Sequence, residues 1–105
     1  METPNLIYIK QLSDGDVTFE NKLISILKRE FPIEVKQYKK NISLKNNIQT
    51  AENVHKIKHK ISILGLEKGY VLATSFEKEL KKGSVSLQVP FEKILDQISV
   101  YLTTI

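Results

Sequence analysis

The chain has 105 residues, 41% of them hydrophobic and 27% charged, which suits a single compact domain spanning residues 1–105. Because it contains no cysteine, disulfides, thiolate metal sites and cysteine nucleophiles are excluded, and we expect a reducing, cytoplasmic setting. Sixteen Lys and Arg against twelve Asp and Glu give a net charge of +4, which suits nucleic acid or an acidic protein surface as partner.

The N-terminal part of the chain predicts a short element followed by a long helix. The short element covers about Asn5 to Leu12 and ends at the turn cluster Ser13-Asp14-Gly15, and Asp16 has a side chain suited to capping the next helix. Pro32 interrupts or kinks that helix, so Ile33 to about Ile42 is predicted as a second helical stretch or a continuation after a bend. An apolar stripe repeats at every fourth position through Phe19, Leu23, Leu27 and Phe31.

The next predicted helix, from about Ile48 to Leu64, carries both histidines of the chain. At about 100° per residue its apolar stripe consists of Val54, Ile57, Ile61 and Leu64. A separate polar face carries His55, Lys58, His59 and Ser62. We therefore expect the two histidines and Lys58 to face solvent.

Two more helices complete the prediction. Gly65 ends the histidine-bearing helix, and the next helix begins near Glu67, turns Leu72, Ala73, Phe76 and Leu80 inward, and stops at Lys81-Lys82-Gly83. After a linker from Ser84 to Val89, Pro90 opens the last helix, whose inward residues are Phe91, Ile94, Ile98 and Tyr101. The sequence thus predicts an all-α fold, an antiparallel four-helix bundle with a short additional N-terminal helix. Apolar runs are too short for a signal peptide or a membrane helix, so we expect no membrane association.

Several kinds of chemistry compete for the polar face around His55. Two histidines four residues apart can bind zinc, but the metalloprotease pattern needs Glu where this chain has Lys56, and Lys58 and Lys60 would repel a dication. A Ser-His-Asp hydrolase would need a strained elbow or a glycine-rich oxyanion loop, and the sequence shows neither. An exposed neutral imidazole can instead be a nucleophile for a phosphoryl group, with Lys58 one turn away to balance charge. A merely solvated face is the other alternative.

A longer pattern favours the phosphoryl interpretation. His55-Lys56-Ile57-Lys58 is followed by Leu64-Gly65-Leu66 and then by Phe76-Glu77 and Gly83. This pattern resembles the histidine-containing phosphotransfer (HPt) domain of two-component phosphorelays, whose motif is His-x-x-Lys-Gly followed by Leu-Gly at this distance. The turn Leu12-Ser13-Asp14-Gly15-Asp16 and the pair Phe31-Pro32 are similar to the start and the bend of the family's first long helix. The resemblance covers about residues 5–102.

The resemblance implies a role for each matching residue. His55 matches the phosphorylated histidine, Lys58 the lysine near the phosphoryl group, and Gly65 the glycine that ends the helix. His59 stands where the family usually has glycine, which would otherwise leave room for the partner's active site. His59, Ser62, Lys56 and Lys60 would form the docking face for a receiver domain.

The resemblance also implies a function. His55 would relay a phosphoryl group between receiver-domain aspartates, with no kinase activity, no metal and no cofactor on this chain. Its partners would be response-regulator receiver domains and a hybrid sensor histidine kinase. The alternative is an HPt-like interaction module that binds a receiver or an acidic protein without phosphotransfer. Nucleic-acid binding through the lysines is disfavoured, because the sequence has no recognised motif and no aromatic stacking strip.

Overall fold

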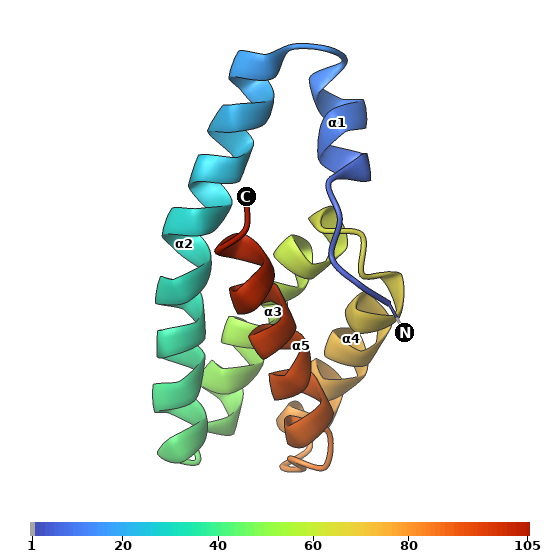
Figure 1. Ribbon diagram of the computed structural model, residues 1–105. Coiled ribbons are helices and arrows are strands. Elements are labelled where there is room, and N and C mark those ends of the chain that lie inside the picture. The colour runs from blue at the N-terminus through green and yellow to red at the C-terminus, as the bar shows by residue number, and fades with distance from the viewer. Residues whose placement is uncertain (1) are drawn as a thin grey trace.

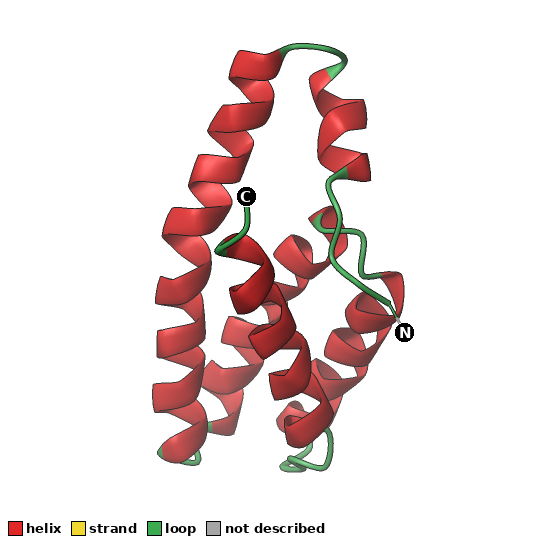
Figure 2. Ribbon diagram, in the orientation of Figure 1, coloured by secondary structure: helices red, strands yellow, loops and turns green. Residues whose placement is uncertain are grey.

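The protein was analysed as a computed structural model that describes residues 2–105, and all regular structure in this range is helical (Figure 2). No helix within it is long and apolar enough to cross a membrane. The helices are α1 (Ile7–Ser13), α2 (Val17–Ser43), α3 (Asn47–Ile63), α4 (Glu67–Lys81) and α5 (Gln88–Leu102).

Helices α2 to α5 pack around one core. α3 contacts α2 and α4, and α5 contacts α4 and α2, so each of these four helices packs mainly on two of the other three (Figure 1). α1 contacts α2 alone among the strong helix pairs, and together α1 and the first turns of α2 extend beyond the other helices (Figure 1). The molecule is elongated as a result, with extents of 44 × 24 × 19 Å.

α2 runs through Pro32 as one helix, so of the two predicted alternatives the continuation is the one found. Asp16 caps it as expected, its carboxylate accepting a hydrogen bond from the Phe19 backbone N–H at 3.0 Å. The helix continues past Pro32 because Phe31 and Tyr38, one on each side of the proline, are both buried in the core and hold the two halves on one axis. Phe19, expected to be inward, is 41% exposed, because only α1 lies beside this end of α2.

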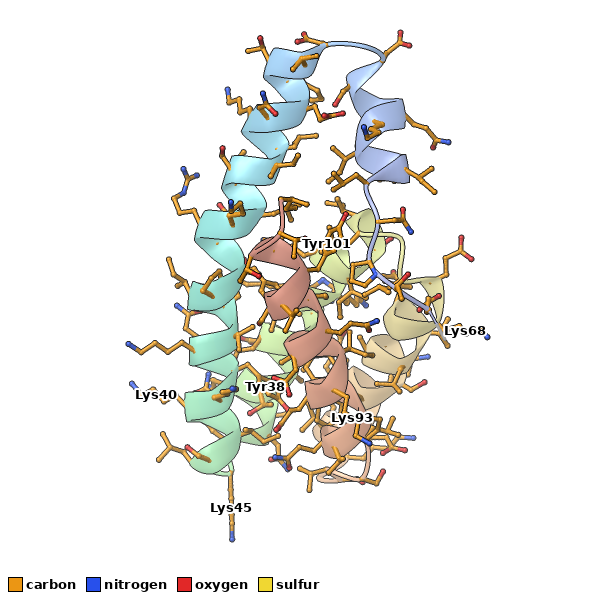
Figure 3. All side chains as sticks on the ribbon, in the orientation of Figure 1. Tyr38, Lys40, Lys45, Lys68, Lys93 and Tyr101 are labelled. Carbon is orange, nitrogen blue, oxygen red and sulfur yellow. The ribbon has the colours of Figure 1, made fainter. Side chains whose placement is uncertain are left out.

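An aromatic cluster fills the middle of the core. Tyr38 lies between α2 and α5 (Figure 3), with its ring centroid 5.2 Å from that of Phe91 and 6.4 Å from that of Phe76. Its hydroxyl donates a hydrogen bond to the Glu92 carboxylate at 3.0 Å, so the buried polar atom is satisfied. Burial, together with the negative charge and hydrogen bond of Glu92, raises the pKa of Tyr38 far above its ordinary value.

The last helix begins two residues earlier than predicted, at Gln88 rather than Pro90. Pro90 is accommodated in the first turn, where backbone N–H groups have no partner within the helix. Ile94 and Tyr101 are only partly buried, whereas Leu95 and Leu102, which the spacing did not single out, belong to the core.

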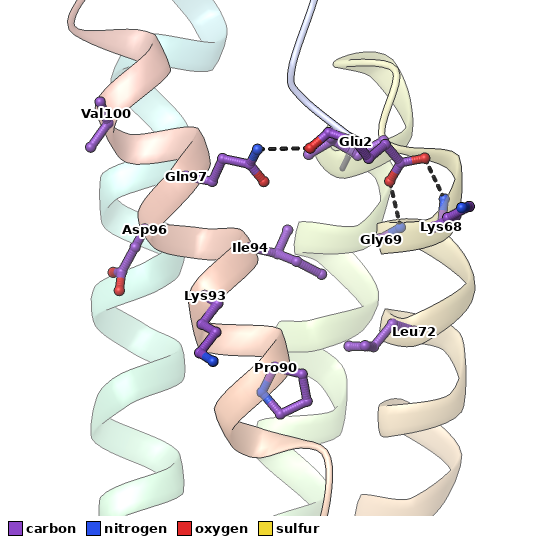
Figure 4. Close-up of a pocket in the computed structure, with 11 residues that line it drawn as sticks. Glu2, Lys68, Gly69, Leu72, Pro90, Lys93, Ile94, Asp96, Gln97 and Val100 are labelled. Carbon is purple, nitrogen blue, oxygen red and sulfur yellow. Dashed lines mark hydrogen bonds between the residues drawn. The ribbon is translucent and has the colours of Figure 1, made fainter.

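The segment that begins at Glu2 contacts the start of α4 and the second half of α5. The Glu2 carboxylate accepts hydrogen bonds from the backbone N–H groups of Lys68 (2.8 Å) and Gly69 (3.0 Å) at the start of α4. Gln97 of α5 donates to the Glu2 carbonyl at 2.8 Å (Figure 4). These bonds place residue 2 over a largely apolar groove of about 640 Å³ between α4 and α5.

Gly65 forms the turn between α3 and α4, as predicted, in a left-handed conformation with φ of +82°. The Asn5 backbone N–H donates to the Leu64 carbonyl at 2.9 Å, which brings the N-terminal segment against this turn. A Cβ atom added at Gly65 would lie 2.5 Å from Asn5 Nδ2. The backbone angle therefore favours glycine here, and any larger residue would also displace the Asn5 side chain.

We expect Gly65→Ala to lower the free energy of unfolding by about 2 kcal/mol, because it adds a steric clash to the strain of a left-handed non-glycine residue. Gly83→Ala is the matched control, since Gly83 has φ of +87° and nothing within 4 Å of an added Cβ. It should lose only the backbone strain, about 1 kcal/mol. Equal losses in urea unfolding would contradict the proposed contact with Asn5.

Candidate functional site

His55 and His59 lie on the solvent side of α3, as the helical periodicity predicted. The apolar residues Val54, Ile57 and Ile61 are fully buried on the opposite side and hold the helix against the core. The His55 side chain is 53% exposed. The His55 and His59 rings meet edge to face, with centroids 5.1 Å apart and planes at 90°. The two imidazoles thus form one exposed aromatic pair.

Lys58 is not on the exposed face, which corrects the prediction. Its side chain is only 11% exposed, because α4 packs over this side of α3. The Lys58 ammonium lies 3.0 Å from Glu77 Oε1 and 5.6 Å from the centroid of the Tyr70 ring, both residues of α4. The lysine therefore contributes to the contact between two helices as well as to the charge near His55.

Glu77 is the residue at the centre of the site. Its carboxylate lies 3.2 Å from His55 Nδ1 through each oxygen, 3.0 Å from the Lys58 ammonium and 3.5 Å from the Lys81 ammonium. The sequence placed Glu77 in the Phe76-Glu77 motif but gave it no role. Two features of the sequence could have indicated a role for Glu77: it follows the inward Phe76, and it lies four residues before Lys81, the spacing of an ion pair on a helix.

The Glu77 carboxyl group is held in its charged form. Burial disfavours that form, but hydrogen bonds from Lys58 and His55, together with the charges of these groups, outweigh the burial and set the pKa of Glu77 below its ordinary value. A charged carboxylate facing Nδ1 favours the imidazole tautomer that carries its proton on Nδ1. The lone pair of that tautomer is on Nε2, the ring atom remote from Glu77.

A shallow cleft of about 410 Å³ lies beside His55. The cleft is lined by Ala51, Glu52, His55, Lys56, Glu77 and Lys81. The His55, Glu77 and Lys81 side chains of this lining also contact one another through the Glu77 carboxylate, so the cleft opens onto the imidazole and its carboxylate.

The other residues predicted on the docking face divide into two groups. Lys56, His59 and Ser62 are exposed. Lys60 instead turns toward α2, where its ammonium lies 3.1 Å from Glu30 and 2.8 Å from Glu34. Burial lowers the pKa of Lys60, but the hydrogen bonds and charges of Glu34 and Glu30 raise it by more, so the net shift is upward. Lys60 is thus engaged between helices, away from His55.

Comparison with known proteins identifies no relative: no family model, no curated protein and no solved structure matches the chain. Within residues 2–105, no three His, Asp or Glu side chains form a group that could hold a metal ion. The site consists of an exposed imidazole in contact with a carboxylate. Two ammonium groups, those of Lys58 and Lys81, contact the same carboxylate.

Lys58→Met should lower the free energy of unfolding by about 2 kcal/mol at pH 7, because it leaves the largely buried Glu77 carboxylate without its closest cation. The aliphatic stem is kept, so the loss reports the charge. Lys56→Met is the control: Lys56 lies on the same helix, is exposed, and should change stability by about 0.5 kcal/mol or less. Similar losses in the two variants would contradict a structural role for Lys58.

The difference between these two variants should also depend on pH. The pKa of Glu77 is lowered on folding, so the stabilisation by its ion pairs is present above its ordinary pKa of 4.5 and is lost as the pH falls through the lower folded value. Unfolding curves at pH 7 and pH 3 should therefore show the gap between Lys58→Met and Lys56→Met shrinking in acid.

Proposed function

We propose that this chain is a histidine phosphotransfer domain, an antiparallel four-helix bundle with a short N-terminal helix that relays a phosphoryl group between receiver-domain aspartates through His55. The observation that supports the proposal best is the contact of His55 Nδ1 with the Glu77 carboxylate at 3.2 Å on an exposed helix face. This contact leaves Nε2 as the accessible nucleophilic atom.

The proposed step begins with an aspartyl phosphate on the receiver. The lone pair of His55 Nε2 attacks phosphorus, the N–P bond forms, and the bond between phosphorus and the aspartyl oxygen breaks. The aspartate leaves as a carboxylate, so no proton has to move. The imidazole ring becomes positively charged while keeping its Nδ1 proton, and the Glu77 carboxylate stabilises that charge. Transfer to the second receiver reverses these events.

Two lysines support the same step. Lys58 and Lys81 lie 3.0 and 3.5 Å from Glu77, so two positive charges accompany the one carboxylate that contacts His55. This charge offsets the negative charge that arrives with the phosphoryl group. Because Lys58 is held by packing between α3 and α4, it is a fixed charge that needs little reorganisation as the reaction proceeds.

The chain would act as a carrier without kinase activity and without a cofactor of its own. We propose receiver domains of response regulators and a hybrid sensor histidine kinase as its partners, and the cytoplasm as the compartment. Nucleic acid and membranes are not proposed as partners. Lys56, His59 and Ser62, which are exposed near His55, would contact the receiver.

The second candidate function is a binding module of the same fold that has lost phosphotransfer. The observation that favours it is the His59 ring packed edge to face on His55 at 5.1 Å, because this ring occupies space beside the reactive atom. Labelling of the chain by a phosphorylated receiver distinguishes the two functions.

Incubation with a receiver domain charged by acetyl phosphate and Mg²⁺ should label His55, as a phosphoramidate that is labile in acid and durable in base. His55→Gln should abolish labelling without a large loss of thermal stability, since the side chain is half exposed. His59→Gln, which removes the other imidazole, should still be labelled, although at a changed rate because His59 would contact the receiver. Labelling of His55→Gln at the rate of the unmodified chain would contradict the proposal.

His59→Gly should slow transfer from a cognate receiver while sparing other receivers, because His59 lies one turn from His55 on the docking face and is positioned to discriminate between partners. The change also costs about 1 kcal/mol of helix stability. Transfer rates with a panel of receivers provide the measurement. Uniform acceleration across the panel would show that His59 only obstructs access.

A further inference from the structure

His55 and His59 are close enough to bind one metal ion together. They are four residues apart on α3, both are exposed, and their ring centroids are 5.1 Å apart. The rings meet edge to face, so binding would require one exposed ring to rotate until both nitrogens point at the ion. Side chains four residues apart on a helix lie on the same face and can bind one ion together. They are the only histidines in the chain, which has no cysteine, so no other imidazole and no thiolate competes for these metals.

The Glu77 carboxylate prepares His55 for this role. Imidazole ligands commonly donate their second ring N–H to a carboxylate, which fixes the ring orientation and makes the metal-binding nitrogen more basic. Glu77 lies 3.2 Å from His55 Nδ1 and so provides this arrangement, with Nε2 facing away from it.

The structure reduces the electrostatic objection that the sequence raised, while Lys58 and Lys81 share the single carboxylate of Glu77, so one positive charge of this cluster stays uncompensated. The Lys58 ammonium is 3.0 Å from Glu77 and largely buried, so its charge is paired. The Lys60 ammonium is paired with Glu30 and Glu34 on the α2 side of the helix. Lys81 also lies near Glu77, at 3.5 Å. Of the three lysines around the histidines in the sequence, Lys56 alone makes no ion pair within the described part of the chain.

We propose that His55 and His59 form a binding site for a late first-row divalent cation such as Zn²⁺, Ni²⁺ or Cu²⁺. His55 Nε2 and one ring nitrogen of His59 would be the protein ligands, and water would fill the remaining positions. Imidazole favours these cations over Mg²⁺ and Ca²⁺, which prefer oxygen ligands. The site itself does not depend on the proposed function. The expected competition does rest on the proposed function, because a cation on Nε2 and a phosphoryl group on Nε2 exclude each other.

Zn²⁺ titration followed by calorimetry at pH 7.5 tests the site directly. The unmodified chain should bind one Zn²⁺, and both His55→Gln and His59→Gln should weaken binding at least tenfold. Lys56→Gln should tighten binding, because it removes the unpaired positive charge beside the pair. Absence of Zn²⁺ binding, or affinity unchanged in either histidine variant, would overturn the proposal.

Nitrogen NMR of the imidazole rings identifies the ligand atom. On addition of Zn²⁺, the His55 Nε2 resonance should shift while Nδ1 keeps its proton, and a His59 ring nitrogen should shift in parallel. A shift confined to His55 would contradict a shared site. In Glu77→Gln, which keeps an acceptor oxygen but no charge, Zn²⁺ affinity should fall less than in either histidine variant.

A labelling experiment separates this inference from the proposed function. Zn²⁺ added at saturation, as judged from the titration, should block phosphoryl acceptance by the unmodified chain, whereas the receiver alone should still be phosphorylated by acetyl phosphate at the same Zn²⁺ concentration. Unhindered labelling of a Zn²⁺-saturated chain would show that Nε2 is not the shared atom and would overturn the site as drawn. A chain that binds Zn²⁺ but is never labelled would instead contradict phosphotransfer and leave the metal site standing.

Discussion

The carboxylate of Glu77 is the interaction on which the site depends. It joins α4 to α3 by contacting His55 and Lys58, and it contacts Lys81 one turn along its own helix. One group therefore orients the imidazole, fixes the buried lysine and draws the two helices together. Because the carboxylate is only 12% exposed, these contacts are screened by solvent less than an ordinary surface ion pair.

The placement of this cluster on two packed helices matters for its chemistry. In the proposed transfer, a nucleophile on a mobile loop would have to be ordered at each encounter, whereas His55 is carried by a helix whose opposite side, including Val54 and Ile57, is fully buried. The turn at Gly65 and the N-terminal segment that packs on it hold the connection from α3 to α4. The scaffold thus supplies a rigid carboxylate–imidazole contact beneath an open surface.

The two proposals share one atom. His55 Nε2 is the position left free by Glu77, and it suits either an incoming phosphoryl group or a divalent cation. His59 has a different part in each proposal: it would contact the receiver in phosphoryl transfer and would be the second ligand in metal binding. A residue that departs from the pattern of the HPt family is thereby given a physical role in both proposals.

The sequence by itself determined the helical fold, most helix ends, most of the buried stripe residues and the exposure of both histidines. Asp16 and Gly65 act through bonds and angles within a few residues, and apolar periodicity follows from the geometry of one helix. Tertiary structure decided which neighbour each polar side chain meets. Lys58 and Lys60 both looked like surface lysines, but one pairs with α4 and the other with α2. The helical repeat determines on which side of its helix a side chain lies, whereas the residue that this side chain contacts depends on which other helix packs on that side.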